Sequence, residues 1–294
     1  MFAGIDTLVF DIQDIGTRFY TYMGTMGESM IAAAEHGIRF VVLDRPDPID
    51  GVHIEGPVTD AGRESFTAWD AIPLRHGMTI GELARFFRDS RRLDSLELEI
   101  VKCEHWSRAV RFDRTGLPWV SPSPNMRNLV QELLYPGIGL LETTNLSVGR
   151  GTATPFEWFG APWISGDEAS ELVDALRERS LPGIFFAPCL FTPDASVHAH
   201  KECHGVQMTL TNPDTLEPVR VGIEIAVELQ RRFADRWNGG LNGNRGGGAF
   251  DRLLVHRQTL ERLSEGGSYE EIVTGWRTGL EIFAQRRQDV LLYT

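Results

Sequence analysis

The sequence predicts an α/β protein whose first half is built on a largely parallel β-sheet. Residues 5–11 form an apolar run that ends in an acid, which is typical of a buried strand. Residues 18–35 carry apolar side chains at helical spacing, and Gly37 follows where a helix is expected to end. Residues 39–44 form a second apolar run ending in an acid. Because a strand–helix–strand order needs a crossover, we expect parallel strands with helices on the faces of the sheet.

The rest of the first half alternates irregular and regular segments. Prolines and glycines interrupt residues 44–77 throughout, so no regular structure is expected there. Thr79 followed by Glu82 has the spacing of a capping box, which predicts a helix over 79–91. Alternating apolar and polar side chains predict a strand over 96–103.

The second half predicts a smaller α+β domain. The apolar run 137–141 ends in Glu142 and is expected to form a third strand with an acid at its end. Further periodic segments predict helices over 129–134, 167–179, 221–236 and 269–280 and a strand over 205–210. We place the domain boundary between residues 134 and 135, which gives domains 1–134 and 135–294.

Composition excludes several classes of protein. The 294 residues carry a net charge of −12, and binding to a nucleic-acid backbone relies on cationic side chains that displace counterions, so we expect no nucleic-acid partner. No apolar run reaches the roughly 18 residues of a membrane-spanning helix. The three cysteines are odd in number and form no CxxC, which argues against a disulfide framework or a structural zinc module. No signal-peptide pattern opens the sequence, which predicts a cytoplasmic location.

Three apolar runs each end in an acid, namely Asp11, Asp44 and Glu142. In open α/β sheets ligands bind where the carboxyl ends of the strands meet, so the three acids together favour a site over ordinary turn and cap positions. Two carboxylates facing one cleft would suit glycoside hydrolysis, with one as acid and the other as base or nucleophile. They would equally suit a divalent cation, and the residues leave this choice open.

Other catalytic signals are weaker. His198 and His200 would share one face of an extended segment, but no HExxH signature accompanies them, so we expect surface histidines and predict no metal site. The sequence contains no GxSxG, SxxK or GxxxxGK[ST] pattern. Residues 149–152 could direct backbone N–H groups and the Arg150 guanidinium at an anion.

Ordered motifs run along the whole chain and together resemble a known family. They occupy residues 8–22, 42–48, 55–57, 75–82, 115–120, 122–126, 135–137, 141–152, 155–156, 160–163, 203–207 and 291–293. This series is similar to the DUF1343 family, the NamZ-type exo-β-N-acetylmuramidases of bacterial peptidoglycan recycling. The resemblance implies a Rossmann-like N-terminal domain followed by a smaller C-terminal one. It also implies hydrolysis that releases N-acetylmuramic acid from the non-reducing ends of peptidoglycan fragments.

The resemblance carries expectations for the site. No cofactor is implied, neither a nicotinamide nor an obligatory metal, and the implied partner is a peptidoglycan-derived amino sugar of which the lactyl carboxylate could be gripped by an arginine. The catalytic carboxylates would be Glu142 and Asp11. The residues expected to shape the sugar pocket are Asp14, Arg18, Tyr20, Asp44, Arg45, His76, Asn125, Asn145 and Arg150.

One departure from the family concerns the N-terminus. Family members begin upstream with a β–α unit and a Pro-Glu-His-Gly motif whose glutamate is a leading catalytic candidate, and this motif is absent here. We therefore expect the N-terminal domain to lack its first β–α portion, which leaves activity, a secreted or periplasmic location and the oligomeric state open. The alternatives are a non-catalytic sugar-binding remnant and a metal-dependent hydrolase that uses the same acids.

Overall fold

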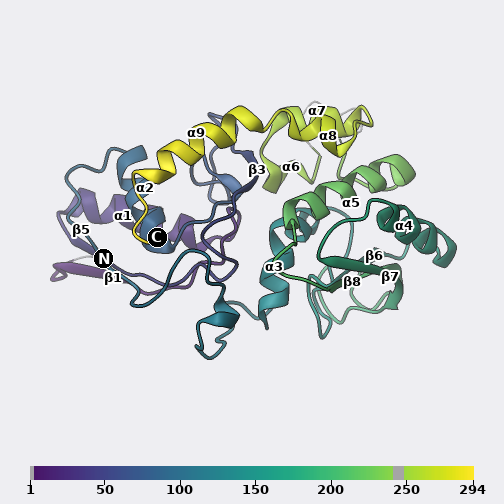
Figure 1. Cartoon of the computed structure of the whole chain (residues 1–294), viewed down its shortest axis with the longest axis horizontal. Helices are drawn as coiled ribbons and strands as arrows, with labels where there is room; N and C mark the ends of the chain where they lie inside the picture. The colour runs from purple at the N-terminus through teal and green to yellow at the C-terminus, as the bar shows by residue number, and fades with distance from the viewer. Residues whose placement is uncertain (1–2, 241–247) are drawn as a thin grey trace. The chain divides into compact units, whose positions relative to one another are not determined.

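A computed structural model describes residues 3–240 and 248–294, which divide into two compact units (Figure 1). Unit 1 comprises residues up to Pro122 together with Thr278–Thr294, and unit 2 comprises Ser123–Arg277. Unit 2 begins at Ser123, whereas the predicted boundary follows residue 134, and Thr278–Thr294, which the prediction placed in the second domain, belong to unit 1. Among the helices in the described part of the chain, none is long and apolar enough to cross a membrane.

Unit 1 is built on the predicted parallel sheet. Its strands lie in the order β1-β2-β5, and every pairing is parallel. Two helices, α1 and α2, make the crossovers, and Gly37 ends α1 in the left-handed conformation with φ of 64°. The bounds are β1 (Thr7–Phe10), α1 (Tyr22–His36), β2 (Arg39–Leu43), α2 (Ile80–Ser90), β5 (Leu98–Val101) and the 3-10 turn η1 (Phe112–Arg114). The α/β prediction for the first half is confirmed.

The core of unit 1 lies between the sheet and its helices. Met23, Met26 and Met30 recur on one face of α1 and are fully buried against Phe40 of β2. The C-terminal helix α9 (Arg277–Gln288) lies beside α2, where the rings of Phe86 and Phe283 are 5.8 Å apart (Figure 1). Segments from both ends of the chain therefore share one hydrophobic core.

The prediction of no regular structure over 44–77 is wrong in part. β3 (Glu55–Val58) and β4 (Pro73–Arg75) form a two-stranded antiparallel pair. The register shifts between Glu55 and Val58, and this irregularity accommodates Pro57, which has no N–H to give to a ladder. Short, bulged pairs of this kind carry no periodic pattern in the sequence.

Unit 2 has the predicted α+β character. Its antiparallel sheet has the order β6-β8-β7, and α4 packs against β7 and β8 (Figure 1). The predicted single helix over 269–280 is two helices, α8 and α9, separated at residues 274–276. The bounds are α3 (Leu129–Ile138), the 3-10 turn η2 (Gly139–Thr143), β6 (Trp158–Ala161), α4 (Gly166–Glu178), β7 (Ile184–Phe191), β8 (Cys203–Leu210), α5 (Pro218–Phe233), α6 (Asp251–Leu254), α7 (Arg257–Ser264) and α8 (Tyr269–Val273).

The predicted strand over 137–141 is wrong. These residues form the end of α3 and the turn η2, and Glu142 lies within that turn. The run is apolar because α3 packs closely against α5: a Cβ on Gly137 would lie 1.9 Å from the carbonyl oxygen of Pro218. A short apolar run fits a buried helix as well as a buried strand, so periodicity could not decide between them.

The α3–α5 contact gives a prediction for stability. Gly137→Ala places a methyl group into the backbone of α5, so we expect the free energy of unfolding to fall by about 3 kcal/mol. Gly279→Ala in α9 is the matched control, because its Cβ would meet only Val58 at 3.5 Å. There we expect no loss, since alanine favours helix by up to about 1 kcal/mol. Urea unfolding of both variants tests this, and equal stabilities would contradict the close packing.

Candidate active site

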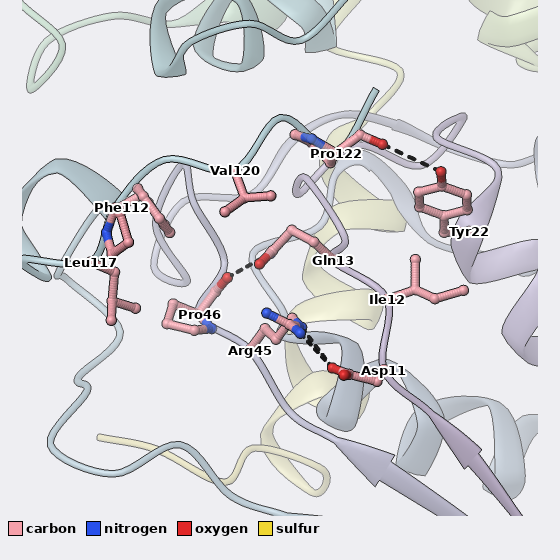
Figure 2. A pocket seen from close by; sticks show the side chains of 11 residues that line it. Asp11, Ile12, Gln13, Tyr22, Arg45, Pro46, Phe112, Leu117, Val120 and Pro122 are labelled. Atoms are coloured by element: carbon pink, nitrogen blue, oxygen red, sulfur yellow. Dashed lines mark hydrogen bonds and ion pairs between the residues drawn. The ribbon is translucent and has the colours of Figure 1, made fainter. Parts of the chain in front are cut away.

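A pocket of about 440 Å³ in unit 1 opens at the carboxyl ends of β1 and β2 (Figure 2). Asp11 follows β1 and Arg45 follows β2, and the two side chains pair in the pocket. Oδ1 of Asp11 accepts hydrogen bonds from Nε of Arg45 at 3.1 Å and from Nη2 at 2.5 Å. The side chains are 50% and 42% exposed, so both remain open to a ligand. Adjacent parallel strands thus bring a carboxylate and a guanidinium together, as the strand-end argument predicts.

The other walls of this pocket combine polar and apolar groups. Nε2 of Gln13 donates to the carbonyl oxygen of Pro46 at 3.0 Å, which ties the loops after β1 and β2 together (Figure 2). The hydroxyl of Tyr22 donates to the carbonyl oxygen of Pro122 at 3.3 Å. Across the pocket lie the apolar side chains of Phe112, Leu117, Pro118 and Val120. A few convergent polar groups with an apolar wall are typical of a small-molecule site.

Tyr20 does not line this pocket but contacts two residues that do, Tyr22 and Pro122. Its hydroxyl donates to the carbonyl oxygen of Pro122 at 3.1 Å, and its ring meets that of Tyr22 edge-to-face with centroids 5.0 Å apart. Both tyrosines therefore hold one end of the apolar wall.

Asp14 and His76 lie together in the interior of unit 1 and not in the pocket lining. Both are buried, and Oδ2 of Asp14 accepts from the N–H of Gly16 at 2.7 Å and lies 3.2 Å from Nε2 of His76. Nδ1 of His76 accepts from the N–H of Met78 at 3.1 Å. The buried Asp47 lies near this pair, and burial first, then the charge of Asp14, raises its pKa well above the ordinary value. These contacts position the loop that follows β1.

Arg18 is fully buried and bonded to backbone. Its Nη1 donates to the carbonyl oxygens of Pro57 at 3.0 Å and Ile72 at 3.1 Å, which joins the segments around β3 and β4. Burial lowers the pKa of Arg18 to about 9, and Asp60 partly opposes this. A guanidinium engaged in this way contributes to the fold of the loop and lies away from the pocket.

The carboxylate of Asp44 accepts hydrogen bonds from residues at the N-terminus of α2. It accepts from the N–H of Gly81 at 2.7 Å and from the hydroxyl of Thr79 at 2.8 Å, and Tyr293 also donates to it. Burial raises the pKa of Asp44, and these hydrogen bonds counteract the rise. An acid that follows a strand can therefore be taken up by a helix N-terminus, which is the capping role that such residues often have.

In unit 2, Glu142 and Arg150 form a second ion pair. Oε1 of Glu142 lies 2.7 Å from Nη2 of Arg150, and their side chains are 26% and 32% exposed. Oε2 of Glu142 has no hydrogen-bond partner within the described part of the chain. Burial raises the pKa of Glu142, while Arg150 lowers it; the pKa of the adjacent Tyr135 is also raised, by burial and by the charge of Glu142. A carboxyl pKa raised by burial is one property that a general acid needs.

The two asparagines of the predicted site lie in loops of unit 2. Asn145 is fully engaged: its side chain donates to the carbonyl oxygen of Arg236 at 2.8 Å and accepts from the N–H of Asn238 at 3.1 Å. Its own carbonyl oxygen lies 2.8 Å from Nε2 of His198. Asn125 is half-buried beside Ser123. In residues 3–240 and 248–294 no group of three or more His, Cys, Asp or Glu side chains is placed to hold a metal ion.

Comparison with known proteins assigns the family. The model "Exo-beta-N-acetylmuramidase NamZ, N-terminal" matches residues 1–130, and its C-terminal counterpart matches residues 133–293. The chain belongs to the NamZ family. It is 42% identical over 293 residues to the peptidoglycan beta-N-acetylmuramidase NamZ of Bacillus subtilis strain 168, covering all of this chain and 69% of that protein.

Solved structures agree with the NamZ assignment. A DUF1343 family protein of Bacteroides fragilis superimposes with a TM-score of 0.87 at 32% identity, over 98% of this chain and 75% of that one. A second one gives a TM-score of 0.77 at 29% identity, over 98% and 76%. The fold prediction and the family resemblance are both confirmed.

In this NamZ-family chain, some of the predicted site residues form close side-chain pairs. It brings together Asp11 with Arg45, Asp14 with His76, and Glu142 with Arg150. Sequence reasoning did not single out Asp47 or Tyr135. The signal available for both was their place inside motifs, at 42–48 and 135–137, that resemble the family.

Proposed function

We propose that this chain is an exo-β-N-acetylmuramidase, which hydrolyses the β-glycosidic bond of N-acetylmuramic acid at the non-reducing end of peptidoglycan fragments. The observation that carries the proposal is the 42% identity over 293 residues to the Bacillus subtilis peptidoglycan beta-N-acetylmuramidase. The matches of both NamZ family models support it.

Glu142 is the proposed general acid. Glycoside hydrolysis needs a carboxylic acid that protonates the leaving oxygen as the bond to the anomeric carbon breaks. Burial raises the pKa of Glu142, which is the direction that a general acid needs, and Arg150 bonds to Oε1 only. The proton of the Glu142 carboxyl passes to the glycosidic oxygen as its bond to the anomeric carbon breaks, and a water molecule supplies the hydroxyl group that this carbon gains.

Asp11 and Arg45 are the proposed polar contacts in the pocket of unit 1. Of the three arginines that could hold the lactyl carboxylate, Arg18 is bonded to backbone carbonyls and Arg150 is paired with Glu142. Arg45 is also paired, with Asp11, but its side chain is 42% exposed against 32% for Arg150 and it lines a pocket, which makes it the best candidate. Asp11 is the proposed charge-stabilising carboxylate.

The pairing of Glu142 with Arg150 predicts a shift in the pH profile. Arg150→Met removes the positive charge that lowers the pKa of Glu142, so that pKa rises. Because a general acid works only while protonated, activity is lost as the pH rises through its pKa. We therefore expect the basic limb of the kcat/KM profile to move to higher pH by about one pH unit. Arg177→Met, on α4, should leave the limb in place, and a shift of the Arg150 variant to lower pH would contradict the assignment.

The function itself is tested with two chromogenic substrates. We expect release of 4-nitrophenol from a β-N-acetylmuramide and none from the matching β-N-acetylglucosaminide, which lacks the lactyl group. Failure to turn over the muramide would overturn the proposal. Binding of N-acetylmuramic acid without turnover would instead indicate a sugar-binding remnant.

A further inference from the structure

Two buried aspartates lie behind the pocket of unit 1, one on each of the loops that supply its polar groups. Asp14 follows Gln13 on the loop after β1, and Asp47 follows Pro46 on the loop after β2. The two aspartates are only 3% and 2% exposed, and neither lines the pocket. The proposed mechanism uses neither of them, so their carboxyl groups need another explanation.

Gly16 brings the two carboxyl groups together. Oδ2 of Asp14 accepts a hydrogen bond from the N–H of Gly16 at 2.7 Å. A Cβ on Gly16 would lie 2.7 Å from Oδ1 of Asp47 and 2.6 Å from Cγ1 of Ile49. Gly16 has φ of 75°, a conformation that favours glycine. Both carboxyl groups therefore lie against one residue, and the two loops approach this closely because that residue has no side chain.

The arginines near the two aspartates have other partners. Nη1 of Arg75 pairs with Glu55 at 2.6 Å, and its Nη2 pairs with Asp50 at 2.8 Å. Nη2 of Arg287 donates to a backbone carbonyl oxygen at 2.6 Å. The positive charge of Arg75 is therefore already shared between two other carboxylates.

His76 brings no positive charge to the two aspartates either. Its Nδ1 accepts a hydrogen bond from the N–H of Met78 at 3.1 Å, so this nitrogen carries no proton and the imidazole is neutral. Its Nε2 lies 3.2 Å from Oδ2 of Asp14. Within residues 3–240 and 248–294, Oδ1 of Asp14 and Oδ2 of Asp47 have no hydrogen-bond partner. Two buried carboxyl groups therefore meet without a cation bonded to those oxygens.

This arrangement favours one proton on the pair. Two neighbouring carboxylates in a buried setting repel each other and lose their hydration, so one of them keeps its proton to a higher pH. Burial first, then the charges of Asp14 and Asp50, raises the pKa of Asp47 well above its ordinary value, and the charge of Arg75 only partly opposes this. Asp47 is therefore the member of the pair that stays neutral.

The loop that contains Asp47 is bonded to two walls of the pocket. The carbonyl oxygen of Pro46 accepts from Nε2 of Gln13 at 3.0 Å, and that of Pro48 accepts from the N–H of Phe112 at 3.1 Å. Gln13, Pro46 and Phe112 all line the pocket. A displacement of this loop would therefore change the shape of the pocket on both sides.

We propose that Asp47 is a positioning residue: as a neutral acid held beside Asp14, it fixes the loop from which Arg45 enters the pocket. An ionised Asp47 would repel the carboxylate of Asp14 and push the two loops apart. The inference rests on the proposed function for the ligand that Arg45 contacts, but the protonation of Asp47 does not depend on that function.

Thermal unfolding tests the proton on Asp47. A carboxyl with a raised pKa in the folded state loses stability as the pH rises above its unfolded pKa of about 3.9, because the folded state keeps a proton that the unfolded state has released. Asp47→Asn keeps the shape of the neutral acid and releases no proton. We therefore expect its Tm relative to the wild type to increase from about pH 5 to about pH 7. Asp174→Asn, an exposed change on α4, should show a constant difference, and a constant difference for Asp47→Asn would overturn the inference.

Steady-state kinetics test the positioning of Arg45. Asp47→Ala frees the loop, so we expect KM for a 4-nitrophenyl β-N-acetylmuramide to rise about tenfold while kcat changes less than about twofold. Asp47→Asn should keep KM close to the wild-type value. In an Arg45→Met background, Asp47→Ala should add no further rise, because its effect passes through Arg45. Equal rises for the alanine and asparagine variants, or an additive rise in the Arg45→Met background, would overturn the positioning role.

The two experiments separate this inference from the proposed function. Absence of turnover by the wild type would overturn the muramidase proposal, and the unfolding experiment would still decide whether Asp47 holds a proton. Turnover with an unchanged KM in both Asp47 variants would overturn the positioning role and leave the muramidase proposal intact. If Asp47→Ala does not fold, the pH dependence of Asp47→Asn decides the inference.

Discussion

Glu142→Gln is expected to lower kcat on a muramyl disaccharide by about 100- to 10,000-fold, the usual range for loss of a general acid. Glutamine keeps the shape of the side chain and its bond from Arg150, but it has no proton to give to the leaving oxygen. Steady-state kinetics at the pH optimum measure the loss.

The leaving group provides the internal control for this prediction. A 4-nitrophenolate departs with little help from an acid, so the variant should lose much less activity on the 4-nitrophenyl muramide than on the disaccharide. Glu171→Gln, an exposed change on α4, should lose nothing on either substrate. Equal losses of the Glu142 variant on both substrates would show that Glu142 has another role.

The largest expected loss of stability comes from Glu82→Ala. Glu82 is fully buried, and Oε1 accepts from Nη1 of Arg108 at 2.5 Å and from the N–H of Leu292 at 2.8 Å, while Oε2 accepts from the N–H of Thr79 at 3.0 Å. Truncation leaves the buried Arg108 without its ion-pair partner. Because an uncompensated buried charge is costly, we expect the free energy of unfolding to fall by about 3–5 kcal/mol.

A second capping box in the same chain is the matched control. Glu271 makes the same reciprocal bonds with Ser268 at the start of α8, but its side chain is exposed and has no buried arginine to satisfy. Glu271→Ala should therefore be far less destabilising than Glu82→Ala in urea unfolding. Equal losses would mean that the cap alone, and not the buried ion pair, sets the cost.

Local patterns predicted much of the fold. The three-residue spacing of Thr79 and Glu82 was enough to place the start of α2, because a capping box is a local motif. The other partners of Glu82, Arg108 and Leu292, are 26 and 210 residues away, and no local pattern indicates them. The strand prediction for 137–141 was wrong for a related reason. These residues are apolar because α5 packs against them at Gly137, and α5 is distant in sequence.

The sequence indicated which residues gather near the strand ends, but it did not indicate which of them face the pocket and which hold the fold together. Asp11 and Arg45 follow neighbouring parallel strands, so their contact follows from topology. Arg18, within the same motif as Asp11, is instead bonded to the carbonyl oxygens of Pro57 and Ile72. Which side of a loop a residue faces depends on tertiary packing, and one sequence does not reveal it.

Release of N-acetylmuramic acid from the non-reducing end is tested on a short peptidoglycan glycan that begins with N-acetylmuramic acid and is labelled at its reducing end. Mass spectrometry of the digest identifies the first sugar released. We expect free N-acetylmuramic acid to appear first, from the non-reducing end, with the wild type and to be greatly reduced with Glu142→Gln. Release of N-acetylglucosamine first, cleavage within the chain, or an intact glycan would contradict it.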